Sequence, residues 1–233
     1  MLKRGFDMLA SALGLVLLAP LFALLAIWVR MDSAGPIFTR QVRVGRRRRE
    51  FRLLKFRTMV ASASGLGLAM PVDDRDARLT KLGFALRKLG LDGLPQLLNV
   101  LRGDMSMVGP RPEVPRFVMQ FDRMQLKALD VRPGLFDPAM FALGREIPVV
   151  TVGSESERVY IEQIVPDRLA KNLAHIDSSN VFADIWFAVL SGFRQLGKSL
   201  DVHAVQEGLR LRREALANAT VRIPALRGAL SAK

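Results

Sequence analysis

The most apolar part of the chain, residues 8–29, contains no charged side chain. As one straight helix this run would cover about 33 Å, enough to cross a bilayer core of about 30 Å. Pro20 stands in its middle and is expected to kink such a helix. Basic residues flank the run on both sides, whereas a spanning helix usually has its excess of Lys and Arg on one side. The pattern alone leaves a spanning helix and a bent, re-entrant helix equally open.

Shorter patterns predict the other elements. Alternating polar and apolar residues in Glu50–Phe56 are typical of a strand with one buried face, and residues 80–89 show helical periodicity. Residues 181–193 are strongly apolar but short for a span, so they fit a core helix or one at a membrane interface. The other expectations are a loop at 61–71, a turn at Arg132-Pro133-Gly134, extended segments over 136–152, a helix over 155–173 interrupted near Pro166, and a basic helix from Gln206 that ends in a loose tail.

Composition adds charge to this picture. The formal net charge is +13, the pI is about 11.2, half of the residues are hydrophobic and the mean hydropathy is +0.19. Basicity combined with high hydropathy points to an anionic membrane surface or a phosphorylated substrate, with nucleic acid as the rival. The chain has no cysteine, which excludes disulfides and thiolate metal sites. His175 and His203 have no metal-ligand spacing between them.

Basic side chains crowd the segment from Arg40 to Arg57, against Glu50 alone. Such a stretch close to an apolar run is expected to bind anionic headgroups, at about 1 kcal/mol for each residue near the surface. Nucleic acid binding would require aromatic stacking residues or a recognisable module. The phenylalanines here fit a half-buried strand instead, so we expect no nucleic acid partner.

A second charged cluster consists of Asp73, Asp74 and Asp76, mixed with Arg75 and Arg78. Several carboxylates together can bind a hard cation such as Mg²⁺. Local ion pairs in a solvated loop are the commoner outcome for such a mixture. The pattern favours the loop.

The segment from Leu91 to Pro112 carries the candidate chemistry. Asp92 precedes a short apolar helix with Pro95 in its first turn, and a turn rich in Gly, Pro and Arg follows. A helix N-terminus suits phosphate, and the planar fork of Arg111 can grip phosphate oxygens. Asp-Gly is also a common turn dipeptide, and Asp is a favoured N-cap. The two roles are compatible, because a helix dipole keeps an N-capping carboxylate ionised.

Further motifs follow one another in a fixed order along the chain. Each is weak alone, but their order and spacing are specific, and over about residues 2–195 the chain resembles the bacterial sugar transferases, the small monotopic polyprenyl-phosphate phosphoglycosyl transferases. The motifs are Lys3-Arg4-Gly5-Phe6-Asp7, Asp32-Ser33-Ala34-Gly35-Pro36-Ile37-Phe38, Gln41-Val42-Arg43-Val44-Gly45, Lys55-Phe56-Arg57-Thr58-Met59, Asp76-Ala77-Arg78-Leu79-Thr80-Lys81-Leu82-Gly83, Leu86-Arg87-Lys88, the segment from Leu91 to Pro112, and Val131-Arg132-Pro133-Gly134.

The resemblance implies an α/β fold that is mainly helical, with few short strands. It implies a kinked re-entrant membrane helix over residues 1–31, with both ends on the cytoplasmic face of the bacterial inner membrane. A compact cytoplasmic catalytic domain with interfacial amphipathic helices would occupy residues 32–200. A basic C-terminal helix and tail would occupy residues 201–233.

The resemblance also implies a reaction. Sugar-1-phosphate passes from a nucleoside diphosphate sugar, usually a UDP-sugar, to a polyprenyl phosphate through a covalent Asp-phosphosugar intermediate, which starts glycoconjugate or exopolysaccharide assembly. Asp92 would be the nucleophile and a ligand of Mg²⁺, which neutralises the leaving charge. Arg111 and Arg87 would clamp phosphate, and Lys55 and Arg57 would also bind substrate. Anionic lipids are expected partners, and a homodimer is compatible with this reading.

The chain departs from the family pattern at three places. The Glu of the family's Asp-Glu pair is Gly93 here, the Ser-Pro of the helix break is Ala19-Pro20, and a segment resembling Thr-Gly-x-Ala-Gln reads Phe136-Asp137-Pro138-Ala139-Met140. The loss of the Glu predicts reduced activity, since poor metal alignment costs several kcal/mol of transition-state stabilisation.

Activity is not expected to vanish, because a carboxylate and a phosphate monoester are both ionised near pH 7. Asp104 or Glu113 could replace the missing carboxylate. The alternative is a catalytically impaired homologue that binds a substrate or a partner enzyme at the membrane, and a third reading is a basic membrane-surface scaffold without chemistry.

Overall fold

The computed structural model describes residues 2–60, 78–143, 155–178 and 180–199. Several sequence expectations lie outside these ranges: the loop at 61–71, the carboxylates Asp73, Asp74 and Asp76, most of the segment 136–152, and the helix and tail beyond Gln206.

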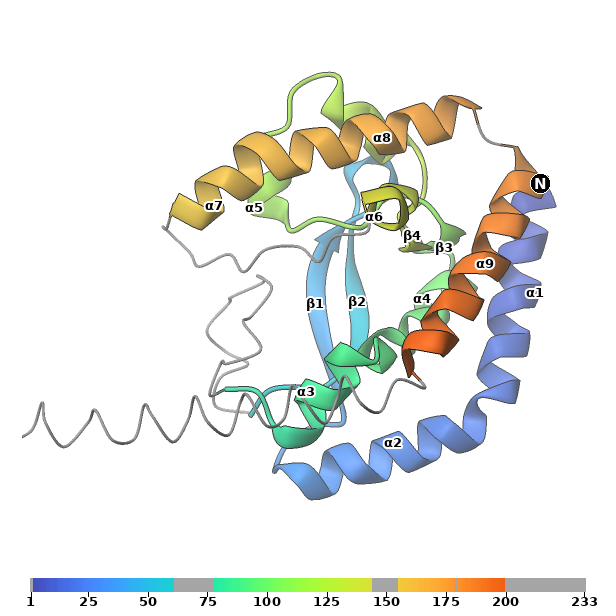
Figure 1. Cartoon of the computed structure of the whole chain (residues 1–233), viewed down its shortest axis with the longest axis vertical. Helices are drawn as coiled ribbons and strands as arrows, with labels where there is room; N and C mark the ends of the chain where they lie inside the picture. The colour runs from blue at the N-terminus through green and yellow to red at the C-terminus, as the bar shows by residue number, and fades with distance from the viewer. Residues whose placement is uncertain (1, 61–77, 144–154, 179, 200–233) are drawn as a thin grey trace, which may run out of the picture.

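Helices dominate the described residues, and the few strands are short (Figure 1). The mainly helical α/β class predicted from the sequence is therefore confirmed. The α-helices are α1 Leu2–Leu17, α2 Ala19–Asp32, α3 Lys81–Lys88, α4 Gln96–Arg102, α5 Pro115–Val118, α6 Pro138–Leu143, α7 Glu155–Val159, α8 Val165–Ser178 and α9 Val181–Ser199. Shorter helical turns are η1 Arg46–Arg48, η3 Leu91–Gly93, η4 Gln125–Asp130 and the π-helical η5 Tyr160–Ile164. The strands are β1 Phe38–Val44, β2 Glu50–Phe56, β3 Ser106–Val108 and β4 Gly134–Phe136.

The first apolar run forms two helices rather than one. Helices α1 and α2 meet at Leu18 with a bend of 63°, and Pro20 lies in the first turn of α2. Proline cannot donate the backbone hydrogen bond that would continue α1, so the break follows from the sequence. Among the described residues no single helix is long and apolar enough to cross a membrane, whereas the bent pair together has the length and composition of a broken span or a re-entrant loop.

Polar residues near the start of α1 fasten it to the rest of the molecule. The buried carboxylate of Asp7 accepts hydrogen bonds from Ser106 Oγ at 3.0 Å and from the backbone N–H of Met107 at 2.9 Å. Arg4 donates to the carbonyls of Val100 and Leu101 at 2.7 and 2.8 Å. These carbonyls lie in the last turn of α4, where carbonyls lack the donors of a continuing helix, and the Val100 carbonyl also accepts the Gly103 N–H at 3.1 Å. The Lys3–Asp7 motif therefore works as a docking element for α1.

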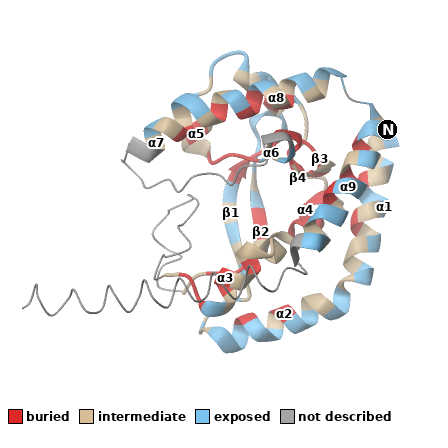
Figure 2. Cartoon of the chain, in the orientation of Figure 1, coloured by how far each residue is buried: buried red, intermediate tan, exposed pale blue. Residues whose placement is uncertain are grey.

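Strands β1 and β2 form an antiparallel hairpin in the middle of the molecule, with Phe38 opposite Phe56 and Val44 opposite Glu50. The strand predicted at Glu50–Phe56 is thus confirmed. Phe56 packs with Leu25 and Val29 of α2 and with Leu86 of α3, so this core joins the hairpin to the bent helix pair. Figure 2 shows the buried residues along the hairpin and along the inward faces of α4 and α8.

A second core lies beneath α8, and a third joins β2 to α4. The core beneath α8 consists of Val114, Phe117, Ala128, Tyr160, Val165 and Leu169. The third consists of Leu53, Val100 and Met105. Parallel strands β3 and β4 lie beside it, and a Cβ atom at Gly134 would sit 2.1 Å from the nitrogen of Gly109. The predicted turn residue Gly134 therefore opens β4, where only glycine allows the two backbones to approach.

Three helix predictions are confirmed and one extended prediction is wrong. Thr80 caps α3 by accepting a hydrogen bond from the Gly83 N–H at 2.9 Å. The predicted interruption near Pro166 is the π-helical segment η5, and the apolar run at 181–193 forms most of α9. The extended segment predicted from Phe136 onward ends at once, because Asp137 accepts the Ala139 N–H at 2.9 Å and Pro138 starts α6.

Candidate active site

Asp92 lies in the turn η3, between α3 and α4. The sequence left two local roles open for Asp92, a helix cap and a turn, and the structure shows the turn: the N-cap of α4 is Pro95, without a side-chain hydrogen bond. The reason is local, since Asp92 sits inside a 3₁₀ turn closed by the Leu94 N–H bonding to the Leu91 carbonyl at 3.2 Å. Asp92 is therefore not stabilised by the α4 dipole in the way that an N-capping carboxylate would be.

The carboxylate of Asp92 pairs with Lys55 of β2, with 3.4 Å between Nζ and Oδ2. Both side chains are partly exposed, at 19% for Lys55 and 15% for Asp92. Burial lowers the pKa of Lys55 to about 8, against the opposing effect of Asp92. Arg111, Arg43 and Arg87 contribute to the same lowering, so their positive charges act on the same ammonium group. We call these five residues the Asp92 cluster.

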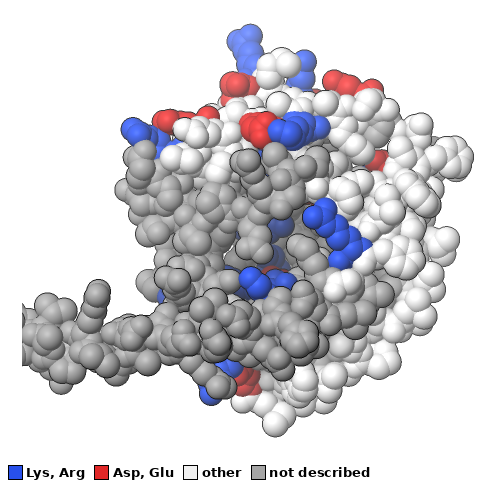
Figure 3. All heavy atoms as spheres, viewed as in Figure 1, with Lys and Arg blue, Asp and Glu red and all other residues white. Residues whose placement is uncertain are grey.

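The structure brings together four of the five residues predicted for the site: Asp92, Lys55, Arg87 and Arg111. Arg87 comes from the last turn of α3, and its Nε donates to Thr58 Oγ1 at 3.0 Å. The backbone N–H of Arg111 donates to Asp137 at 3.1 Å. Figure 3 shows Lys and Arg side chains gathered in a hollow on one face of the molecule.

Arg43 is the member of the Asp92 cluster that sequence reasoning did not assign. It is buried on β1, where it donates to the Pro112 carbonyl at 3.3 Å and to Gln41 at 3.2 Å. Burial lowers its pKa to about 10, while Glu113 opposes this change. Its position in the Gln41–Gly45 motif was the signal that could have identified it.

Arg57, the fifth predicted site residue, has contacts at a different place. Its side chain is buried, and Nη2 donates to the Val29 carbonyl at 3.0 Å and to Ser33 Oγ at 3.0 Å. These groups lie at the C-terminal end of α2, where carbonyls need donors. In this structure Arg57 therefore ties β2 to α2.

A buried ionic network supports the loop that carries Arg111. Arg168 of α8 is fully buried, pairs with Glu113, donates to the Tyr160 hydroxyl at 3.3 Å and lies 3.9 Å from Asp137. Burial alone would lower the pKa of Arg168, but Glu113, Tyr160 and Asp137 together hold it above its usual value. Asp137 in turn accepts the Arg111 N–H. We call Arg168, Glu113, Tyr160 and Asp137 the Arg168 network.

Two carboxylates proposed as substitutes for the missing Glu already have partners. Glu113 belongs to the Arg168 network, and Asp104 accepts a hydrogen bond from Asn99 at 3.2 Å. Gly93 itself has room for a side chain, because a Cβ there would meet only the amide end of Gln96, at 3.0 Å. Gly93 is also not among the described glycines with positive φ, so its backbone does not require glycine.

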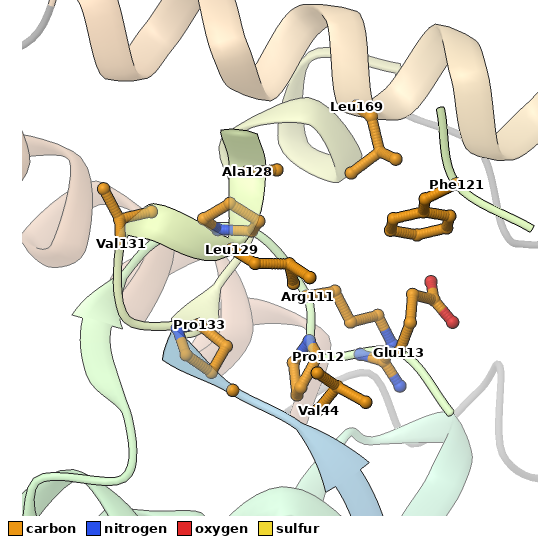
Figure 4. A pocket seen from close by; sticks show the side chains of 12 residues that line it. Val44, Arg111, Pro112, Glu113, Phe121, Ala128, Leu129, Val131, Pro133 and Leu169 are labelled. Atoms are coloured by element: carbon orange, nitrogen blue, oxygen red, sulfur yellow. The ribbon is translucent and has the colours of Figure 1, made fainter. Parts of the chain in front are cut away.

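A small cavity lies behind Arg111, between the end of β1, η4 and α8 (Figure 4). Its volume is about 10 Å³, which is about the space of a single water molecule. It is therefore too small for a nucleotide or a sugar.

The donor set determines what metal the site could hold. Within residues 2–60, 78–143, 155–178 and 180–199, no group of three or more His, Asp or Glu side chains is arranged to bind a metal ion. Asp92 supplies one carboxylate among four cations. Protein sites commonly bind Mg²⁺ through one or two carboxylates and the phosphates of the substrate. Asp92 therefore fits a Mg²⁺ that binds with a phosphorylated substrate.

A carboxylate paired with a lysine on which three arginines also act is a charge arrangement expected of a site that binds phosphate. Comparison with known proteins identifies the class more closely: residues 1–192 match the family model described as bacterial sugar transferase. The chain therefore belongs to the bacterial sugar transferase family, a family of transferase enzymes.

Curated relatives resemble this chain over part of their length. A UDP-N-acetylgalactosamine-undecaprenyl-phosphate N-acetylgalactosaminephosphotransferase of Aeromonas hydrophila is 44% identical over 137 residues, 58% of this chain and 32% of the relative. An undecaprenyl-phosphate glucose phosphotransferase of Komagataeibacter xylinus is 47% identical over 114 residues, 49% of this chain and 21% of the relative. The exopolysaccharide production protein ExoY of Rhizobium meliloti is 39% identical over 149 residues, 58% of this chain and 66% of the relative. The chain thus spans from about a fifth to two thirds of these relatives.

Proposed function

We propose that this chain transfers a sugar-1-phosphate from a nucleoside diphosphate sugar, in the first instance a UDP-sugar, to undecaprenyl phosphate or a similar polyprenyl phosphate. The product would start the assembly of an exopolysaccharide or another glycoconjugate. The observation that carries this proposal is the Asp92 cluster, in which Asp92 pairs with Lys55 and the charges of three arginines act on the same lysine. The printed names of the relatives, which include UDP-sugar and undecaprenyl-phosphate substrates, supply the substrate class.

In the proposed first step, an Asp92 carboxylate oxygen attacks the phosphorus that bears the sugar. A bond forms between this oxygen and phosphorus, and the bond to the bridging oxygen breaks, so the nucleoside monophosphate leaves with the electron pair. In the second step a phosphate oxygen of the lipid attacks the same phosphorus and releases Asp92. A carboxylate and a phosphate monoester attack as anions, so neither step needs a general base.

The cations of the Asp92 cluster would bind the negative charge of the pyrophosphate and of the transition state. Lys55 is already 3.4 Å from Asp92 and would lie close to the phosphorus under attack. Arg87 and Arg111 would grip phosphate oxygens through their planar forks. A Mg²⁺ bound together with the pyrophosphate would supply further neutralisation of charge, with Asp92 as a ligand.

We further propose that the bent pair α1–α2 enters the cytoplasmic leaflet of the bacterial inner membrane and returns to the same side. Exposed apolar side chains on α1 and α2 support this proposal. Helix α9, beside α1, presents further exposed apolar side chains. These side chains include Leu9, Leu13, Val16 and Leu17 of α1, Leu24, Ile27 and Trp28 of α2, and Phe182, Trp186 and Phe193 of α9. Labels placed before Lys3 and after Asp32 should both react from the cytoplasmic side; labelling from opposite sides would contradict the re-entrant arrangement.

The decisive experiment measures nucleoside monophosphate release from purified protein with Mg²⁺, a panel of UDP-sugars and a short polyprenyl phosphate. We expect release by the unmodified chain, a sugar-phosphate adduct on Asp92 by mass spectrometry, and a loss of about a thousandfold or more in Asp92→Asn. Asp177→Asn is the matched control, since Asp177 is an exposed carboxylate on α8. Equal release by Asp92→Asn and the unmodified chain would contradict the nucleophile assignment.

The second candidate, a catalytically impaired homologue, is favoured by one observation, the glycine at position 93. Gly93→Glu separates the two candidates, because the side chain needs only a shift of Gln96. Release by the unmodified chain supports the transferase, and a further rise in Gly93→Glu would measure what the missing carboxylate contributes. Release only in Gly93→Glu, with UDP-sugar binding in both proteins, would support the impaired homologue.

A further inference from the structure

Helix α9 ends beside the turn that carries Asp92, although the two are far apart in sequence. The side-chain amide of Gln195, in the last turns of α9, donates a hydrogen bond to the carbonyl of Leu89. Leu89 is the C-cap of α3, where helix carbonyls lack partners within the helix. Gln195 therefore donates a hydrogen bond to a backbone carbonyl immediately before the turn that carries Asp92.

Gln195 also packs against the next residue, Gly90. A Cβ atom at Gly90 would lie 2.3 Å from Gln195 Nε2 and 2.8 Å from its Cδ. Gly90 has a φ of 68° and is the N-cap of η3, the turn that holds Asp92. The glycine thus satisfies two requirements, a left-handed backbone and the close approach of the Gln195 amide.

Other contacts hold α9 in place, so that Gln195 approaches from a fixed direction. At the start of α9, Asp184 is buried and pairs with Lys3 Nζ at 2.5 Å and with His175 Nε2 at 2.9 Å. Near its end, Arg194 donates to the Phe141 carbonyl at 3.3 Å and stacks over the Phe141 ring at 4.7 Å. Figure 1 shows α9 running along α1 toward the α3–α4 connection.

We propose that Gln195 is a positioning residue for Asp92: by bonding Leu89 and packing on Gly90 it fixes the turn η3, and hence the direction from which the carboxylate approaches phosphorus. This inference rests on the proposed function. Displacement of a reacting group by about 1 Å can lower a rate by a large factor, so a contact two residues from Asp92 can affect the chemical step without touching substrate.

The test compares Gln195→Met, which keeps a long side chain but cannot donate to Leu89, with Gln195→Lys, which keeps a donor. Gly197→Ala is the matched control, because an added Cβ there meets nothing within 4 Å. In rapid-mixing measurements we expect the rate of nucleoside monophosphate release per folded molecule to fall about fivefold in Gln195→Met, with the donor KM unchanged. Gln195→Lys should recover most of this loss, and Gly197→Ala should behave like the unmodified chain.

Hydrogen exchange of the backbone amides of residues 90–94 gives a second readout that does not depend on activity. We expect these amides to exchange about fivefold faster in Gln195→Met than in Gly197→Ala. Unchanged exchange, or an unchanged rate of release, in Gln195→Met would overturn this inference. Absence of release by the unmodified chain would overturn the proposed function, and with it the catalytic part of this inference, while exchange would still decide whether Gln195 fixes the turn.

Discussion

The Asp92 cluster and the Arg168 network are built from the same kinds of charged side chain, yet their charges balance differently. In the Arg168 network one fully buried guanidinium meets the carboxylates of Glu113 and Asp137. In the Asp92 cluster one carboxylate pairs with Lys55, the charges of Arg43, Arg87 and Arg111 act on that lysine, and both Asp92 and Lys55 are partly exposed.

The pKa values express the same contrast. The surrounding carboxylates hold the pKa of Arg168 above its usual value, whereas burial and neighbouring cations lower the pKa of Lys55 to about 8. A buried cation that faces two carboxylates has its counter-charges within the protein itself. An open group with excess positive charge gains stability only when an anion arrives, which is how a phosphate site is expected to look.

The largest expected effect is the loss of folding stability when the Arg168 network loses its cation. Arg168→Met leaves two carboxylates buried without their cation, so we expect a loss of about 3–5 kcal/mol in the free energy of unfolding. Urea unfolding followed by circular dichroism measures this, with Arg123→Met, an exposed arginine, as the control. A loss below about 1 kcal/mol would mean that the Arg168 network does not stabilise the fold.

The next largest effect concerns the Asp92 cluster, where removing a cation should not lower the free energy of unfolding. Arg111→Met removes one of several mutually repelling cations, so the free energy of unfolding should stay equal or rise by up to about 1 kcal/mol. The same variant should raise the KM for the UDP-sugar about tenfold or more, because a charged clamp on phosphate is lost. Unfolding curves and steady-state kinetics on one preparation test both. Destabilisation comparable to that of Arg168→Met would remove the distinction between the two groups.

A smaller effect follows from the pKa of Lys55. Because this pKa of about 8 lies below the ordinary value of 10.5, charged Lys55 costs stability below pH 8, and the cost disappears as the pH rises from about 8 to 10.5. Substrate binding should change in the opposite direction, since neutral Lys55 no longer attracts phosphate. We expect kcat/KM for the donor to fall several-fold above about pH 8.

Lys55→Arg tests this assignment, since an arginine stays charged throughout this range. Around pH 8, where we expect kcat/KM of the unmodified chain to fall, the variant should keep a flat profile, whatever its absolute rate. The phosphates of the donor are fully ionised by pH 8 and add no titration there. An alkaline fall of equal midpoint in both proteins would assign the titration to another group.

Local features of the fold were accessible from the sequence. Pro20 marked the break between α1 and α2, alternation marked β2, and Thr80 opened α3, because each of these signals acts within a few residues. The two alternatives at Asp92 have the same local origin. Asp-Gly before an apolar run is compatible with a cap and with a turn, and the 3₁₀ turn prevailed.

Contacts between distant segments were not accessible in this way. Arg43, Arg168 and Gln195 reach the site from β1, α8 and α9, and no periodicity reports which side chains meet in space. Family resemblance supplied Arg87, Lys55 and Arg111, which the structure places with Asp92. It also supplied Arg57, whose side chain bonds Val29 and Ser33 at the end of α2, a contact that no motif could indicate.

The 63° elbow at Leu18 has a consequence for biogenesis. If both arms lie in one leaflet, no arginine or lysine of the flanks has to be carried through the hydrocarbon, where each would cost about 2.5–3.5 kcal/mol. The domain would then fold first and bind the bilayer after synthesis, with the apolar pair α1–α2 inserting last. If Pro20→Leu removed this bend, α1 and α2 would form one continuous helix. Such a helix would be long enough to cross the bilayer and would require export of one of its ends.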